Sequence, residues 1–144
     1  TDCGSRTSSR TKGLIMKDLY QSLSERCSQK TMSLYSTSFS IGALFLQKEI
    51  RKSIYAVYGF VRLADEIVDT FLSYDQATLL DEFIEETRKA VDRRFSLNPI
   101  LQSFQTCVYR YGIDYHLIDA FFESMKADLT QKRYQRDGFQ KYVY

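Results

Sequence analysis

The chain contains very few residues that break helices. Among its 144 residues there are one proline and six glycines, and two of those glycines lie within the first thirteen positions. Proline and glycine most often end helices and form turns, so their scarcity argues against a turn-rich all-β fold and favours long helices. The sequence therefore predicts an all-α protein, and its length suits one domain with one hydrophobic core.

Composition and charge exclude several classes of protein. Lys and Arg number 20 against 18 Asp and Glu, a formal net charge of +2, which is too balanced to mark a nucleic-acid-binding protein. The longest apolar run, residues 54–61, is far shorter than the about 20 residues that a membrane-spanning helix needs. The three cysteines lack metal-ligand spacing, and their odd number favours reduced thiols in the cytoplasm over a disulfide framework.

The single histidine, His116, limits the metal chemistry. A di-iron helical bundle uses a Glu-x-x-His motif on each of two helices, which one histidine cannot supply. A zinc site or a Ser-His-Asp triad around His116 stays open in principle, although no nearby residue supports either. A half-buried or surface histidine on a helix is the simpler interpretation.

The caps and apolar positions predict a series of helices behind a short leader. Residues 1–15 are rich in Ser, Thr, Gly and Arg, and we expect a disordered leader, a tag or an upstream extension there, with the folded part over residues 16–144. Gly138 to Tyr144 opens an apolar segment with no stop signal, which indicates a sequence that is cut short. We expect helices over residues 18–35, 47–72, 75–95, 98–111 and 114–133, a short apolar piece over 39–46, and a break at Asp137-Gly138.

The strongest signal for chemistry lies between residues 58 and 69. At about 100° per residue, four side chains share one narrow stripe of the expected helix: Tyr58, Arg62, Asp65 and Asp69. Two carboxylates one turn apart repel each other, and Mg²⁺ typically takes one or two carboxylates plus substrate phosphates. Apolar residues flank the stripe, so we expect a buried helix whose acidic pair faces an internal cavity. A plain salt bridge from Arg62 to Asp65 or Glu66 is the alternative that the spacing leaves open.

The same segment resembles a known family. Residues 55–69, YAVYGFVRLADEIVD, are similar to the first aspartate-rich segment of the squalene/phytoene synthase family, and most similar to its phytoene synthase branch. Residues 35–40, YSTSFS, resemble the hydroxyl-rich segment that precedes it. Residues 122–129, FESMKADL, with the Arg-Tyr pair at 133–134, resemble a third family segment. The three segments stand in the family's order, and the resemblance runs from about residue 19 to residue 144.

The resemblance implies an all-α, isoprenoid-synthase-type helical bundle and a transferase activity. Members of the family condense two prenyl diphosphates, geranylgeranyl or farnesyl diphosphate, head to head through a cyclopropyl diphosphate. Mg²⁺, which Mn²⁺ can replace, assists the loss of diphosphate, and NADPH is needed only by squalene-type members. Such substrates imply peripheral contact with a membrane for an otherwise cytoplasmic protein, and no nucleic acid.

The resemblance also implies roles for individual residues. Asp65 and Asp69 would ligate the metal ion, and Arg62 would contact the diphosphate through its planar set of donors. Tyr58 and Tyr144 would line the reaction centre. The other implied residues would donate to the diphosphate, wall the prenyl tunnel, or supply a family acid whose role we do not derive: Ser36 and Ser38, Phe39, and Asp128.

One feature of the family has no counterpart in the sequence. Its second aspartate-rich motif, DxxED on a later helix, is not found after Asp69, so we expect the N-terminal part of the family domain, unable to complete catalysis alone. A non-catalytic relative that acts in assembly or binding is the main alternative. A chain-elongating synthase or cyclase would favour DDxxD, whereas position 66 is Glu. A helical interaction module would leave the acidic pair unexplained.

Overall fold

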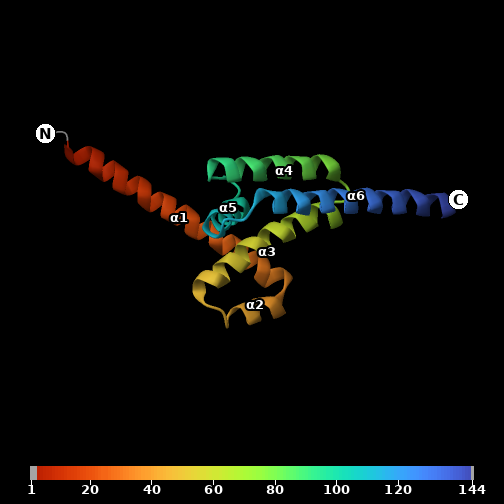
Figure 1. Cartoon of the computed structure of the whole chain (residues 1–144), viewed down its shortest axis with the longest axis horizontal. Helices are drawn as coiled ribbons and strands as arrows, with labels where there is room; N and C mark the ends of the chain where they lie inside the picture. Colours follow the sequence, from red (N-terminus) through yellow and green to blue (C-terminus); the bar gives the residue numbers. More distant parts are fainter. Residues whose placement is uncertain (1–2, 144) are drawn as a thin grey trace.

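The computed structural model describes the backbone of residues 3–143 and the side chains of residues 10–138. This part of the chain is all helical and contains no strand, which confirms the predicted fold class (Figure 1). Its six helices are α1 (Cys3–Tyr35), α2 (Thr37–Ala43), α3 (Lys48–Asp69), α4 (Gln76–Arg93), α5 (Pro99–Tyr111) and α6 (Tyr115–Val143).

Helix α3 is the central element of the bundle. It contacts α1, α4, α5 and α6, while α2 packs against α1. In Figure 1, α4 and α2 lie on opposite sides of the molecule, and the beginning of α1 and the end of α6 project away from the bundle in opposite directions. Neighbouring helices therefore cover some faces of α3 and leave others open to solvent.

Local capping explains several of the helix boundaries. Asp75 and Asn98 each accept a hydrogen bond from a backbone N–H of the next turn, at 3.3 and 3.0 Å, and Asp114 does the same at 3.0 Å. Gly112 ends α5 with a φ of +60°, a conformation that glycine adopts without steric cost. Arg94 ends α4 in the same left-handed conformation, with a φ of +57°. The caps predicted at these aspartate, asparagine and glycine positions are confirmed.

Two expectations about helix ends are wrong. Helix α1 begins at Cys3, within the segment over which we expect a disordered leader, a tag or an upstream extension. Disorder from residue 3 onward is therefore wrong, and a tag or an extension stays a prediction. That segment contains no proline, and a polar, solvent-exposed helix is compatible with its composition. Helix α6 continues through Asp137-Gly138 to Val143, because one glycine inside a helix costs only about 1 kcal/mol and does not by itself break it.

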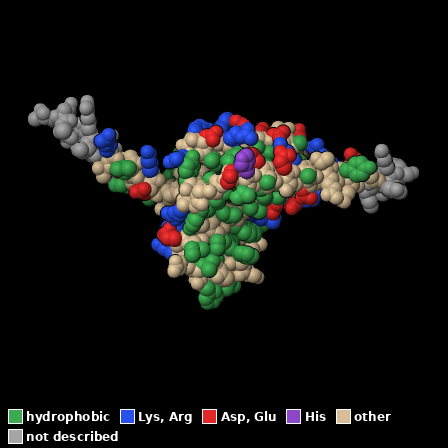
Figure 2. All heavy atoms as spheres, in the orientation of Figure 1, with side chains coloured by type: hydrophobic (Ala, Val, Ile, Leu, Met, Phe, Trp, Pro, Cys, Tyr) green, Lys and Arg blue, Asp and Glu red, His purple; other side chains and the backbone are tan. Residues whose placement is uncertain are grey.

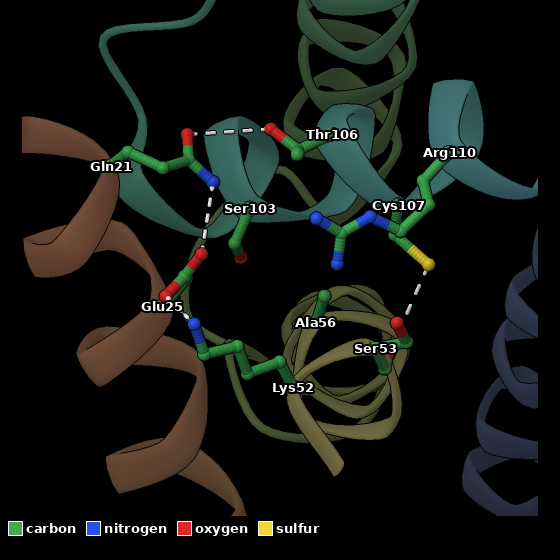
Figure 3. Close-up of a pocket in the computed structure, with 9 residues that line it drawn as sticks. All are labelled: Gln21, Glu25, Lys52, Ser53, Ala56, Ser103, Thr106, Cys107 and Arg110. Carbon is green, nitrogen blue, oxygen red and sulfur yellow. Dashed lines mark hydrogen bonds and ion pairs between the residues drawn. The ribbon is translucent and has the colours of Figure 1, made fainter. Parts of the chain in front are cut away.

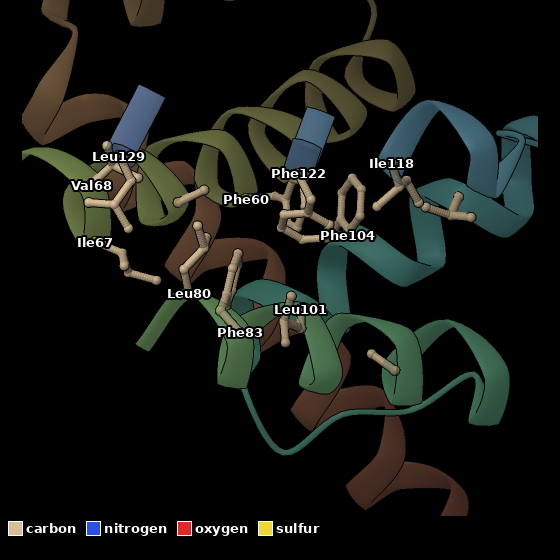
Figure 4. Packing of buried hydrophobic residues seen from close by; sticks show 13 residues of the cluster. Phe60, Ile67, Val68, Leu80, Phe83, Leu101, Phe104, Ile118, Phe122 and Leu129 are labelled. Carbon is tan, nitrogen blue, oxygen red and sulfur yellow. The ribbon is translucent and has the colours of Figure 1, made fainter. Parts of the chain in front are cut away.

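The main hydrophobic core is organised around Phe60 of α3 (Figure 4). Its ring lies parallel to that of Phe104 on α5, with 3.8 Å between the ring centroids. Phe83 of α4 and Phe122 of α6 contact the same ring, at 5.5 and 5.6 Å. One side chain thus joins four helices, and aromatic pairs of this kind stabilise beyond the area that they bury.

The carbonyl end of α3 is capped by a side chain of the next helix. Gln76 is buried, and its side-chain nitrogen donates to the carbonyl oxygens of Ile67 and Val68, at 3.0 and 2.8 Å. Arg136 of α6 donates to the Gln76 amide oxygen at 3.2 Å. These bonds satisfy carbonyls that a helix end leaves without partners, and they hold the end of α3 beside α4 and α6.

Helices α1, α3 and α5 approach closely at Gly59. A Cβ atom at this position would lie 3.2 Å from Ser28 Oγ and 3.3 Å from Ile100 Cδ1. The three helices also enclose a small polar crevice, where Lys52 pairs with Glu25 at 3.4 Å (Figure 3). Its volume of about 20 Å³ has room for about one water molecule. The crevice is therefore part of the packing and not a ligand site.

Candidate functional site

The stripe predicted on α3 exists, but its acidic end lies at the surface. The opposite face of the helix is buried through Ala56, Phe60 and Ala64, Asp65 is half-buried, and the Asp69 side chain is 46% exposed. The expectation that both carboxylates face an enclosed cavity is therefore wrong for the described part of the chain. The physical reason is that α3 packs its neighbours mainly on the other side.

Asp65 occupies an unfavourable place for a negative charge. Burial and the neighbouring charge of Asp69 raise the pKa of the Asp65 carboxyl above its usual value, and Asp128 adds to this effect. Arg62 and Lys132 act in the opposite direction but do not cancel it. A cation placed beside Asp65 would stabilise the ionised form of this carboxyl.

Arg62 is held by two neighbours. It donates a hydrogen bond to Glu66 one turn later, and its guanidinium lies 4.2 Å from the centre of the Tyr35 ring on α1. The hydrogen bond from Arg62 lowers the pKa of the Glu66 carboxyl. The salt bridge to Glu66 that the spacing left open is thus present. Arg62 Nε is buried and has no hydrogen-bond partner within the described residues, so one donor of this guanidinium is left unsatisfied.

Helix α6 brings two further charged side chains to the acidic end of the stripe. Lys132 forms an ion pair with Asp69 and a second one, at 3.6 Å, with Asp128. Asp128, expected at the site from its resemblance alone, therefore lies beside Asp69. Lys132 was not anticipated, and the only signal in the sequence was its spacing of four residues from Asp128, which favours an ion pair on a helix.

An apolar groove begins where the stripe ends. It has a volume of about 520 Å³ and is lined by residues of α2, α3 and α5 that include Phe39, Ile54, Tyr58 and Val61. The rings of Phe39 and Tyr58 lie 6.5 Å apart. Figure 2 shows the hydrophobic side chains gathered over this end of the molecule, around α2 and the beginning of α3. The groove and the charged residues are therefore neighbours on one helix.

The remaining predicted residues are less well placed. Ser36 precedes α2 without making a side-chain capping bond, and Ser38 lines a smaller apolar hollow of about 310 Å³ beside Phe39. Neither hydroxyl has a hydrogen bond to the stripe within the described residues. Tyr144 lies outside the described residues. The structure thus places Tyr58, Arg62, both aspartates and Asp128 along one side of α3, whereas neither serine is hydrogen-bonded to these residues in the described part of the chain.

The donors at the stripe fit part of a Mg²⁺ shell. No group of three or more His, Cys, Asp or Glu side chains in the described part of the chain is arranged to hold a metal ion. Asp65 and Asp69 offer carboxylate oxygens on one face of one helix, which suits a hard cation whose other ligands are water and phosphate. Over the same residues, no helix has both the length and the apolar character needed to cross a membrane.

Comparison with known proteins gives a consistent result. The model of the squalene/phytoene synthase family matches residues 32–144. The chain is 27% identical over 134 residues to phytoene synthase 1, chloroplastic, of Zea mays, and 28% identical over 132 residues to that of Arabidopsis thaliana. Each alignment covers 90% of this chain and 30% of the relative, so the chain spans about 30% of the length of these curated relatives. No solved structure matches it.

Proposed function

The chain belongs to the squalene/phytoene synthase family, and we propose on that basis that it forms the first diphosphate- and metal-binding part of a prenyltransferase. The parent reaction is the head-to-head condensation of two prenyl diphosphates through a cyclopropyl diphosphate. Phytoene-type chemistry is the best candidate, because the relatives from Zea mays and Arabidopsis thaliana are phytoene synthases. That chemistry uses Mg²⁺ and no NADPH, which a squalene-type reaction would require.

The observation that carries this proposal is the continuity of two surfaces along α3. Arg62, Asp65 and Asp69 form the charged end of the stripe. Tyr58 lies one turn before Arg62 on the same face of the helix and lines the edge of the apolar groove. A prenyl diphosphate has the same division, with a strongly charged head and a long apolar tail. Ligand sites combine a mainly apolar lining with a few placed polar groups in this way.

Each residue then has a distinct task. Asp65 and Asp69 would hold the cation, and the Arg62 guanidinium would contact the diphosphate while Tyr35 and Glu66 keep it in place. Phe39 and Tyr58 present aromatic rings along the groove, and such rings stabilise a nearby cation by about 0.5–2 kcal/mol. Bound Mg²⁺ would polarise the leaving diphosphate and offset its charge.

The described residues supply one acidic face at this site, so we propose that the 144-residue chain on its own binds a substrate without converting it. Ser36, Ser38 and Tyr144 stay candidates for contacts that form only around a bound diphosphate. Peripheral contact with a membrane would follow from the apolar substrates. A cytoplasmic location is our prediction for this chain, whereas its curated relatives carry the word chloroplastic in their names.

Titration with a substrate analogue tests the proposal. Geranylgeranyl S-thiolodiphosphate, which does not ionise, should bind in the presence of Mg²⁺ and bind at least tenfold more weakly when Asp65 or Asp69 is changed to Asn. Asp81→Asn, an exposed position on α4, is the matched control and should bind like the unchanged chain. Binding that ignores Mg²⁺ and both aspartates would contradict the metal site. Turnover of radiolabelled geranylgeranyl diphosphate by this chain would contradict its proposed inactivity.

A role in assembly is the second candidate, and the exposure of apolar side chains on and after α2 favours it. Phe45 is 87% exposed, and Ile41 and Leu44 are more than half exposed. Exposed apolar patches often mark interaction sites. Self-association of the chain in analytical ultracentrifugation, together with no binding of the analogue, would favour this alternative over the prenyltransferase.

A further inference from the structure

The ammonium group of Lys132 occupies the place beside Asp69 that a cation would use. Lys132 lies on α6, 63 positions from Asp69 in the sequence, and donates to the Asp69 carboxylate while pairing with Asp128 at 3.6 Å. It therefore links two carboxylates that come from different helices. Its side chain is 37% exposed, so it can leave this position without disturbing the core.

The other cation near the stripe is already engaged. Arg62 donates to Glu66 and lies over the Tyr35 ring, and it sits about two helical turns before Asp69 on α3. Three carboxylates face this region, on Asp65, Asp69 and Asp128, and the charges of Asp69 and Asp128 both raise the pKa of the Asp65 carboxyl. Lys132 is thus the cation that pairs directly with Asp69 and relieves the repulsion among the three.

A divalent cation and an ammonium group cannot use the same carboxylate oxygens at once, and their charges repel each other. We infer that Lys132 is an internal counter-cation of Asp69 that a divalent metal ion must displace, and that Lys132 thereby sets the metal affinity of the site. This inference rests on the proposed function, because it takes Asp69 as a metal ligand. A lysine suits the task, since its charge sits on a flexible stem with no fixed geometry.

The displacement has a measurable consequence. Removing the Lys132 charge removes both its competition for the Asp69 carboxylate and its repulsion of the metal ion, so metal binding should tighten by about three- to tenfold. Retaining the charge as arginine should retain the competition. The effect should also depend on Asp69, because without that carboxylate Lys132 and the metal ion no longer share a partner.

The experiment titrates the chain with Mn²⁺ and follows the electron paramagnetic resonance signal of the free ion, with no substrate present. Lys132→Gln should bind Mn²⁺ about three- to tenfold more tightly than the unchanged chain, and Lys132→Arg should bind it equally. Lys126→Gln is the matched control, because Lys126 pairs with Glu123 on the same helix at 3.6 Å. In an Asp69→Asn background, Lys132→Gln should have no effect. Far-UV circular dichroism verifies that each variant folds.

The outcomes separate this inference from the proposed function. If Lys132→Gln binds Mn²⁺ as well as or more weakly than the unchanged chain, the inference is overturned while the metal site stands. If Lys126→Gln tightens binding as much as Lys132→Gln, the effect is general electrostatics and the inference is again overturned. If no variant binds Mn²⁺, both the inference and the proposed metal site are wrong.

Discussion

Arg62 on α3 lies over the ring of Tyr35 on α1, with the guanidinium carbon 4.2 Å from the centre of the ring. The contact holds the planar donors of Arg62 while Glu66 takes one of them, and Nε stays unpartnered among the described residues. Tyr35 and Arg62, 27 positions apart in the sequence, thus come together, and Arg62 is the residue that we propose to contact the diphosphate.

Arg62→Lys should weaken the binding of inorganic pyrophosphate by about tenfold, because a lysine loses the stacked, forked geometry and about one charge-assisted hydrogen bond. Isothermal titration calorimetry in the presence of Mg²⁺ gives the affinity. Arg88→Lys on α4, where Arg88 makes a loose ion pair with Glu85 at 3.8 Å, is the control and should leave the affinity unchanged. Equal losses in both variants would mean that pyrophosphate senses only the net charge.

Asp65→Asn should stabilise the chain at neutral pH. The folded state holds the Asp65 proton more tightly than the unfolded state, because burial and Asp69 raise the pKa of this carboxyl. Ionisation therefore costs stability as the pH rises through the folded-state pKa. The gain in the free energy of unfolding should be about 0.2–0.5 kcal/mol, the size of a like-charge pair one turn apart.

The gain from Asp65→Asn should disappear below about pH 3.9, the usual aspartate value, where both states are protonated. Urea unfolding at pH 7 and pH 3.5 measures the difference. Asp81→Asn on α4 serves as the comparison and should change stability by less than about 0.5 kcal/mol at either pH. A variant that is less stable at pH 7 than the unchanged chain would show that the Asp65 charge is favourable in the folded state.

Phe60→Ala should destabilise the chain by about 3–5 kcal/mol, the cost of removing a buried aromatic ring and leaving a cavity. Phe60 is 3% exposed and contacts rings from α4, α5 and α6. Phe45→Ala removes an equal ring that is 87% exposed, and should cost less than about 0.5 kcal/mol. Urea denaturation followed by circular dichroism compares the two, and similar losses would refute the central place of Phe60 in the core.

Gly59→Val should destabilise by about 1–3 kcal/mol, because the added atoms would overlap Ser28 and Ile100 where three helices meet. Gly42→Ala is the opposite case. No atom lies within 4 Å of an added Cβ at Gly42, and replacing a helical glycine there should stabilise by about 0.5–1 kcal/mol. Thermal unfolding gives both values, and a neutral Gly59→Val would mean that the helices have room to separate.

Local patterns predicted the helices of the middle of the chain well. The starts at Asp75, Asn98 and Asp114 depend on a side chain and a backbone N–H only two or three positions apart, so sequence is sufficient to find them. The start of α1 and the continuation of α6 past Gly138 were missed, because polar segments without proline carry no local signal that decides between helix and coil.

The candidate site likewise has features that local sequence determines and others that depend on the packing of distant helices. The spacing of Tyr58, Arg62, Asp65 and Asp69 alone put them on one face of a helix, since helix geometry relates neighbours a few positions apart. Whether that face is buried, and which charges meet it, depends on how α1 and α6 pack against α3. Tyr35 beneath Arg62 and Lys132 on Asp69 are contacts across 27 and 63 positions, and packing of the whole bundle, which no local pattern encodes, decides such pairs.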